Sequence, residues 1–188
     1  MSEPVQRPSI LLDVDDVLCP GSPYGGHHVY ETLRFPHLAP ADLYLRLFSE
    51  EAVVVLDGLL EEFDARVVIT SSWLSLFDRI QFEHILRMTG LGRAASNLHP
   101  NWDAVTNRGQ SRLEGILRWL RLHHHGEPFV VLDDAQSGES LVGSTLEAAG
   151  RVVLCGTSGC LTPSHLGLAR RALRTPVYQA PCPAPCRD

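Results

Sequence analysis

The sequence predicts an α/β fold with a central parallel sheet. Short apolar segments typical of buried strands alternate along the chain with segments of helical periodicity. Three predicted strands, at residues 9–14, 65–70 and 128–132, end in carboxylates or hydroxyls. Because the carboxyl ends of parallel strands meet at one edge of a sheet, where ligands bind, we expect these polar groups to converge into a functional site.

Composition narrows the class of protein. The chain has 188 residues, which suits one domain with one sizeable core, predicted at residues 1–176 with a Pro/Cys-rich tail at 177–188. The formal net charge of -6 argues against a strongly basic nucleic-acid-binding module. We expect no membrane segment and no signal peptide, and therefore a cytoplasmic protein.

The five cysteines are an odd number, and the default expectation in this setting is reduced, unrelated thiols. A zinc site is the alternative, with ligands drawn from Cys155, Cys160, Cys182 and Cys186. Their spacings are looser than those of typical zinc motifs.

The predicted elements follow from capping and breaking residues. The strands are expected at 9–14, 65–70, 94–98, 128–132 and 151–155, and the helices at 50–63, 73–88, 110–124, 139–149 and 162–173. Ser49 is a suitable N-cap for the first helix, and Thr162 followed by Pro163 begins the last. Glycines 90, 126 and 150 follow the middle helices, where a helix commonly ends.

Residues 20–48 interrupt this alternation. The segment begins rich in proline and glycine and then offers two apolar stretches, at 28–33 and 43–48. We predict a small β-hairpin flap beside the mouth of the site, the alternative being a surface loop without function.

Asp13 and Asp15 carry the strongest chemical signal. They lie two residues apart after an apolar strand, so their side chains leave the same face of a regular strand. Carboxylates gathered at a strand end favour a bound cation. This pattern suits a carboxylate nucleophile, Asp13, beside a general acid/base, Asp15. The alternative is a solvated Asx turn.

Three motifs in this order resemble the haloacid-dehalogenase-like (HAD) phosphatase superfamily. They are Leu12-Asp13-Val14-Asp15-Asp16-Val17-Leu18, Val67-Val68-Ile69-Thr70 and Val130-Val131-Leu132-Asp133-Asp134. The stretches Thr70-Ser71-Ser72-Trp73 and Arg112-Leu113-Glu114-Gly115, with Gly159-Cys160-Leu161-Thr162, are similar to the HAD domains of Swiss-army-knife RNA repair proteins. Asp16 departs from the pattern, which usually has glycine there.

The resemblance implies a three-layer HAD-like (Rossmannoid) fold without a large cap domain. It implies Mg²⁺ as cofactor, held by Asp13, the backbone carbonyl of Asp15 and the pair Asp133 and Asp134, with Asp134 favoured as the direct ligand. Thr70 is expected to bind a phosphoryl oxygen, assisted by the backbone at Ser71 and Ser72.

A cation should hold the phosphoryl group near the anionic nucleophile. This region has no lysine, so Arg112 is the first candidate and Arg108 the second, the alternative for each being a solvated surface arginine. His28, next to His27 in the flap, is a candidate substrate contact, against an ordinary exposed histidine. Trp73, Trp102 and Trp119 are expected to be packing residues.

Together these features predict a Mg²⁺-dependent phosphomonoester hydrolase with an aspartyl-phosphate intermediate. Its phosphorylated substrate is expected to be a nucleotide, a nucleic-acid end as in RNA repair, or a small phosphomonoester. The alternatives are a phosphotransferase outside nucleic-acid metabolism and a catalytically inactive binding protein of the same fold. The sequence does not indicate the oligomeric state.

Overall fold

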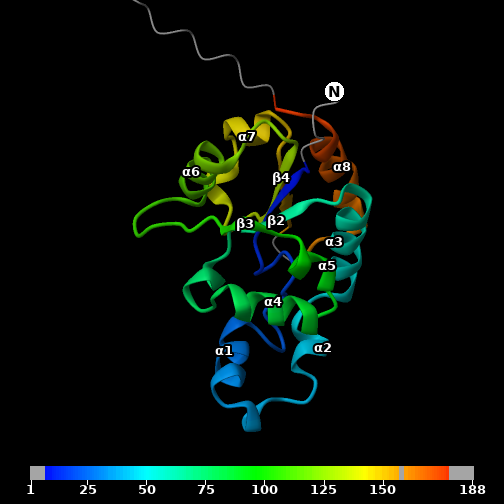
Figure 1. Ribbon diagram of the computed structural model, residues 1–188, viewed down its shortest axis with the longest axis vertical. Helices are drawn as coiled ribbons and strands as arrows, with labels where there is room; N and C mark the ends of the chain where they lie inside the picture. The colour runs from blue at the N-terminus through cyan, green and yellow to red at the C-terminus, as the bar shows by residue number, and fades with distance from the viewer. Residues whose placement is uncertain (1–6, 157–158, 178–188) are drawn as a thin grey trace, which may run out of the picture.

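The chain forms a three-layer α/β structure around a five-stranded sheet (Figure 1). The computed structural model describes residues 7–156 and 159–177. The strands are β1 (Ser9–Leu12), β2 (Arg66–Ile69), β3 (Leu98–Asp103), β4 (Phe129–Asp134) and β5 (Val152–Cys155). All neighbouring pairs are parallel, in the order β3-β2-β1-β4-β5, so β1 occupies the centre. The predicted parallel sheet is confirmed.

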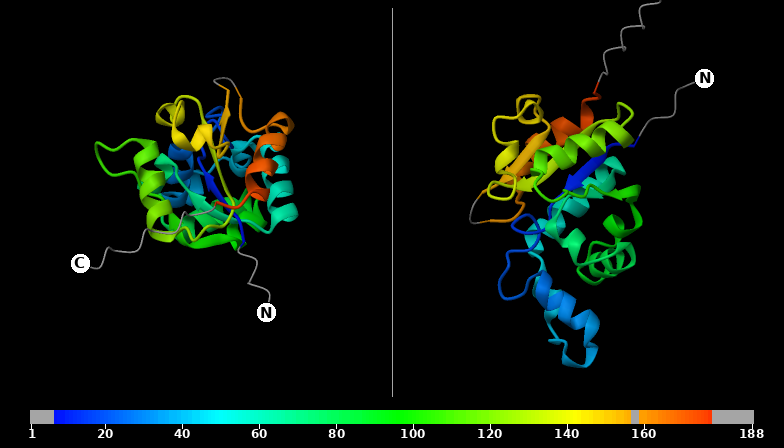
Figure 2. Two further views of the ribbon diagram at one scale, coloured as in Figure 1. Left: turned by 90° about the horizontal axis from the view of Figure 1, so that it is seen from above. Right: turned by 90° about the vertical axis from the view of Figure 1, so that its left-hand side faces the viewer.

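Helices cover both faces of the sheet (Figure 2). On one face lie α3 (Glu50–Phe63), α5 (Gly92–Ser96) and α8 (Leu166–Arg174), and on the other lie α6 (Arg112–His123) and α7 (Thr145–Ala148). Strand β1 is buried along its whole length, and its alternate residues enter different cores. Ile10 and Leu12 belong to the larger core on the α3 side, whereas Leu11 packs in the smaller one beside α6.

Several predicted boundaries shift for local reasons. The helix expected at 73–88 is a short 3₁₀ turn, η2 (Ser72–Ser75), followed by α4 (Arg79–Met88), which Asp78 caps. The helix expected at 139–149 divides into η3 (Glu139–Leu141) and α7, because Gly143 has a φ of 71° between them. The strand expected at 94–98 is wrong: residues 92–96 are helical, and the strand begins at Leu98.

The predicted β-hairpin flap is also wrong. The segment contains two helices, α1 (Gly26–Arg34) and α2 (Leu43–Leu47), joined through the 3₁₀ turn η1 (Pro36–Leu38). The buried residues Val29 and Thr32, and likewise Leu43 and Leu47, are spaced by three or four, which is the helical period. Such short apolar stretches satisfy either periodicity. We call residues 26–47 the helical insert.

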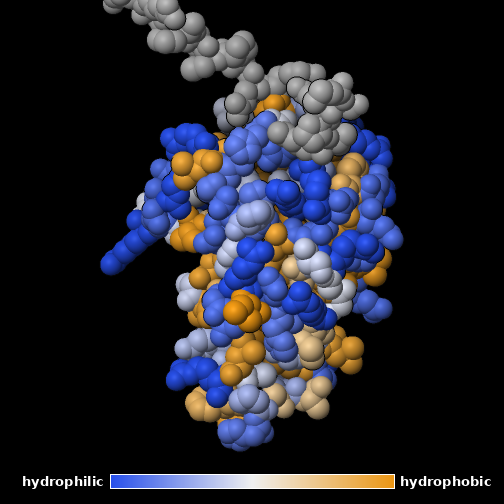
Figure 3. All heavy atoms as spheres, in the orientation of Figure 1, coloured by the Kyte–Doolittle hydropathy of each residue, from blue (hydrophilic) through white to orange (hydrophobic). Residues whose placement is uncertain are grey.

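The helical insert projects from one end of the molecule (Figure 1). Apolar atoms interrupt the mostly polar surface there (Figure 3). The exposed large apolar side chains of the helical insert are Tyr30, Phe35, Leu38 and Leu45, with Leu45 84% exposed. None of the described helices is long and apolar enough to cross a membrane.

Candidate active site

Three buried aspartates meet at the carboxyl edge of the sheet. Asp13 follows β1 directly and donates its backbone N–H to the Leu132 carbonyl oxygen of β4 over 2.9 Å. The next residues of β4 are Asp133 and Asp134. One carboxylate oxygen from each of the three aspartates lies within 4.8 Å of the others, which is close enough for a shared metal ion. Two central strands thus bring together the acids that the sequence placed 120 residues apart.

Each of these acids has a buried oxygen without a hydrogen-bond partner among the described residues: Asp13 Oδ1, Asp133 Oδ2 and Asp134 Oδ2. An unpaired buried carboxylate oxygen is costly. Burial raises the pKa of Asp13 and raises that of Asp133 to about 8, and the negative charges of Asp13 and Asp134 add to the rise at Asp133. A divalent cation would satisfy the oxygens and remove the repulsion.

Arg112 is the cation that reaches this cluster. It is the first residue of α6, where Ser111 and Glu114 form a capping box that determines where the helix begins. Its guanidinium lies 3.2 Å from Asp13 Oδ2 and 3.4 Å from Asp133 Oδ2. The Arg112 side chain is only 10% exposed, so its charge acts in a poorly solvated setting. One arginine faces three acids, and the cluster remains short of positive charge.

Asp15 is directed away from the three acids. Trp73 donates its indole Nε1–H to Asp15 Oδ1 over 2.9 Å, and Ser72 Oγ donates to Asp15 Oδ2 over 3.4 Å. The Asp15 side chain does not belong to the group of acids that could share a metal. It is half-buried and lies beside Ser72, which lines the neighbouring cavity, a position that suits proton transfer better than metal binding.

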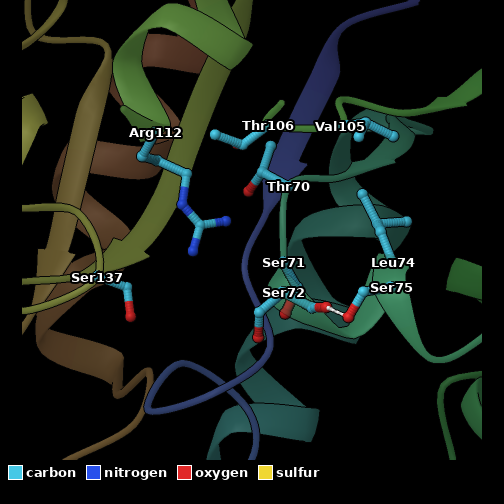
Figure 4. Close-up of a pocket in the computed structure, with 9 residues that line it drawn as sticks. All are labelled: Thr70, Ser71, Ser72, Leu74, Ser75, Val105, Thr106, Arg112 and Ser137. Atoms are coloured by element: carbon cyan, nitrogen blue, oxygen red, sulfur yellow. Dashed lines mark hydrogen bonds between the residues drawn. The ribbon is translucent and has the colours of Figure 1, made fainter. Parts of the chain in front are cut away.

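Hydroxyl groups surround a cavity of about 390 Å³ beside the acids (Figure 4). Its lining includes Arg112 and the hydroxyl residues Thr70, Ser71, Ser72, Ser75, Thr106 and Ser137. Thr70 lies beside Asp13, because its backbone N–H bonds the Leu12 carbonyl oxygen over 2.8 Å. Thr70 Oγ1 is buried without a hydrogen-bond partner among the described residues, so this donor is available to an anionic ligand.

Gly138 and Ser137 are site residues that the sequence reasoning missed. The backbone N–H groups of Gln136 and Ser137 both donate to Asp134 Oδ1, at 2.7 and 2.8 Å, and leave Oδ2 free. A Cβ atom on Gly138 would lie 2.6 Å from the Asp134 carbonyl oxygen, so only glycine fits there. A glycine shortly after the double aspartate was the available signal.

Two predicted substrate contacts lie elsewhere. Arg108 is exposed in the loop before α6 and is not among the residues that line the cavity. His28 accepts the Gly25 backbone N–H through Nδ1 over 3.1 Å and so caps α1. It lines a separate hollow of about 360 Å³ within the helical insert.

Asp16, which stands where the resemblance calls for glycine, adopts a φ of 54°. This left-handed conformation explains why glycine is suited to the position and how aspartate is tolerated. Trp73 and Trp119 are buried, as predicted.

The described cysteines do not form a metal site. Cys19, Cys155 and Cys160 are buried and free, and burial raises the pKa of each thiol, to about 12, 12 and 11 respectively. Such thiols are poor ligands and nucleophiles. Cys182 and Cys186 of the alternative zinc set lie outside the described residues.

A parallel sheet between two helical layers, with aspartates gathered at its carboxyl edge, defines the HAD-like fold class. The sequence model for the family described as "HAD domain in Swiss Army Knife RNA repair proteins" matches residues 9–166, and the chain belongs to this family. Membership indicates hydrolase chemistry of the phosphatase kind, on a phosphorylated substrate in general. No curated protein and no solved structure shows a significant match to the chain.

Proposed function

We propose that the protein is a Mg²⁺-dependent phosphomonoester hydrolase that works through an aspartyl-phosphate on Asp13. The observation that carries the proposal is the buried three-acid cluster, in which one arginine pairs with two of the acids and one oxygen of each acid has no hydrogen-bond partner among the described residues. The repulsion between these buried acids is unfavourable when no cation is bound. A bound cation would offset it and allow an anionic phosphoryl group to bind.

In the first step, a carboxylate oxygen of Asp13 attacks phosphorus while the bond from phosphorus to the ester oxygen breaks. Asp15, protonated, gives its proton to the departing oxygen, so the alcohol leaves neutral. Arg112 and the Thr70 hydroxyl are positioned to bind the phosphoryl oxygens as negative charge shifts onto them.

In the second step, water attacks the phosphorus of the aspartyl-phosphate. Asp15, now a carboxylate, accepts a proton from that water, and the bond between phosphorus and the Asp13 oxygen breaks. Inorganic phosphate leaves, and both aspartates return to their starting states.

Mg²⁺ would be held by Asp13, Asp133 and Asp134, whose free oxygens are the hard ligands that this ion prefers. The backbone carbonyl of Asp15 stays a predicted further ligand. When bound, the ion supplies positive charge that offsets the repulsion between the acids and an incoming phosphate.

The physiological substrate stays open between a nucleotide, a nucleic-acid end and a small phosphomonoester. The small helical insert and the polar cavity are compatible with each of these. The family's description favours RNA ends. The cytoplasmic location stays a prediction.

A phosphatase screen tests the proposal. It compares mononucleotides, 3'- and 5'-phosphorylated oligonucleotides and p-nitrophenyl phosphate, with Mg²⁺ or with a chelator, at two salt concentrations. We expect phosphate release only with the metal, and steep salt dependence if the substrate is a polyanion.

Asp13→Asn should lower the rate by about 10³-fold or more, whereas the matched exposed control Asp16→Asn should keep most of it. Full activity in Asp13→Asn would refute the nucleophile. Transfer of phosphate to added alcohol instead of water would indicate a phosphotransferase, and binding without turnover of any ester would indicate an inactive member of the family.

A further inference from the structure

We infer that Trp73 is a positioning residue that holds Oδ1 of Asp15 and so leaves Oδ2 as the oxygen that serves the leaving group, and that Gly26 of the helical insert makes this possible by leaving room for the indole. This inference rests on the proposed role of Asp15 as the general acid. It assigns a task to a tryptophan that the sequence suggests only as a packing residue.

Trp73 contacts the side chain of Asp15 directly. Trp73 is 2% exposed, and its Nε1–H donates to Asp15 Oδ1 over 2.9 Å. An indole N–H is only a donor, so it favours an Asp15 oxygen that acts as a pure acceptor. The indole therefore occupies Oδ1 and leaves Oδ2 free to act on the substrate.

Oδ2 is the oxygen of Asp15 that lies next to a residue of the cavity wall. Its neighbour Ser72 Oγ, at 3.4 Å, lines that cavity, and a hydroxyl can either donate or accept. The two neighbours leave Oδ2 as the oxygen that delivers the proton to the leaving group.

The indole itself is held by aromatic packing and by the insert. Phe77 and Phe48 lie 5.5 and 6.2 Å from Trp73 between ring centroids. A Cβ atom on Gly26 would lie 2.9 Å from Trp73 Cε2 and 3.1 Å from Nε1, so a larger residue would displace the ring. Gly26 begins α1 and Phe48 follows α2, so both ends of the helical insert meet the residue that orients Asp15.

The test uses two esters that need the general acid to different degrees. p-Nitrophenyl phosphate has a leaving group that departs without a proton, whereas a simple alkyl phosphate does not. We expect Trp73→Phe to lower kcat/KM by about tenfold for the alkyl ester, the effect of one lost hydrogen bond to a charged group, and by less than threefold for the aryl ester.

Trp102→Phe is the packing control, because it removes a second indole of the aromatic cluster, 5.4 Å from Phe82 between ring centroids, and leaves Trp73 unchanged. We expect it to change the two esters by the same factor. Equal losses on both esters in Trp73→Phe would overturn the inference and leave Trp73 a packing residue.

A second variant covers the case in which Trp73→Phe does not fold. Gly26→Ala should displace the indole and reproduce the selective loss on the alkyl ester. Gly58→Ala in α3 is its matched control, because an added Cβ there meets no atom within 4 Å. Equal rates in Gly26→Ala and Gly58→Ala on both esters would contradict the role of Gly26.

An NMR measurement separates this inference from the proposed function. The chain has three tryptophans and hence three indole N–H signals. The indole N–H signal of Trp73 is assigned by its loss in Trp73→Phe. Its chemical shift should change in Asp15→Asn and stay the same in Asp16→Asn. An unmoved signal in Asp15→Asn would refute the contact whether or not the protein hydrolyses any ester, and a moved signal without turnover would refute only the proposed function.

Discussion

Two clusters of carboxylates and arginines in this molecule have opposite charge balance. On the surface, Glu62 of α3 lies between Arg170 and Arg174 of α8, at 2.7 and 2.6 Å. At the carboxyl edge of the sheet, Arg112 is the one arginine among the described residues that pairs with Asp13 and Asp133. The arginines lower the pKa of Glu62, Arg170 most of all, whereas burial raises the pKa of Asp13 and Asp133 despite Arg112.

This difference in charge balance indicates different roles: the surface cluster links two helices, whereas the buried cluster is suited to binding a ligand. The surface cluster has a full set of partners and stays in contact with water, so it needs nothing further. The buried cluster has more acids than its one arginine can neutralise, so it destabilises the folded protein until a metal cation binds. Changes to the buried cluster should therefore have much larger effects than equivalent changes to the surface cluster.

Arg112→Gln should have the largest effect. It leaves two buried acids without a cation, and we expect a loss of about 3–5 kcal/mol in the free energy of unfolding without Mg²⁺ at pH 8, together with a fall of about 10²-fold or more in kcat. Urea unfolding measures the free energy of unfolding, and steady-state kinetics measure kcat.

Arg108→Gln is the matched control for Arg112→Gln and should be nearly neutral in both measurements, because Arg108 is exposed away from the cavity. Arg112→Lys should be intermediate, since it keeps the charge without the two-pronged geometry. Equal effects at Arg112 and Arg108 would show that the buried position has no special importance.

Gly138→Ala should have the next largest effect. The added Cβ would lie 2.6 Å from the Asp134 carbonyl oxygen and 3.2 Å from Asp133 Cγ, and it should displace both acids. We expect Mg²⁺ affinity to fall by about tenfold or more, as when groups that orient metal ligands are altered. Calorimetric titration measures this, with Gly167→Ala in α8 as control because its Cβ meets nothing within 4 Å. Unchanged affinity would argue that the metal lies elsewhere.

The pH dependence of stability should be smaller but diagnostic. The pKa of Asp133 is about 8 in the folded protein against an ordinary 3.8, so between these values the folded state binds more protons than the unfolded state. Stability of the metal-free protein should therefore fall as pH rises from 5 to 8. Saturating Mg²⁺ should remove most of this fall by binding the ionised acids.

Thermal unfolding at several pH values, with Mg²⁺ or with a chelator, measures this dependence. Asp133→Asn cannot ionise and should give a flatter curve without metal than the unaltered protein. An equally steep curve in Asp133→Asn would assign the dependence to other groups.

Glu62→Gln should have the smallest effect. It weakens two exposed ion pairs between α3 and α8, which water and salt already screen. We expect a slight decrease in melting temperature at low salt that disappears at high salt, with kcat unchanged. A loss of activity here would contradict the separation between the two clusters.

Much of the sheet and its acidic edge could be predicted from the sequence, because both depend on local patterns. An uninterrupted apolar strand followed by acids places Asp13 and Asp133 at the same edge of any parallel sheet. The capped helix at residues 50–63 has the predicted bounds. The two helices of the insert could not be distinguished from strands, since each apolar stretch is too short to show one clear period.

Contacts between residues far apart in the sequence could not be predicted either. The contact of Trp73 with Asp15 spans 58 residues, and no spacing rule predicts it. The choice between Arg112 and Arg108 depended on where α6 begins, which the Ser111–Glu114 capping box determines. These two arginines are four positions apart in the sequence, and only Arg112 reaches the acids.

The most direct test of the central claim is to trap the phosphorylated enzyme. The protein is mixed with Mg²⁺ and a phosphomonoester that it hydrolyses, quenched in acid within the first turnover, and digested for peptide mass spectrometry. We predict one phosphoryl group on the peptide that contains Asp13, absent in Asp13→Asn and when the metal is chelated. Turnover with no phosphoryl group on that peptide at any quench time, or a phosphoryl group on another residue, would contradict it.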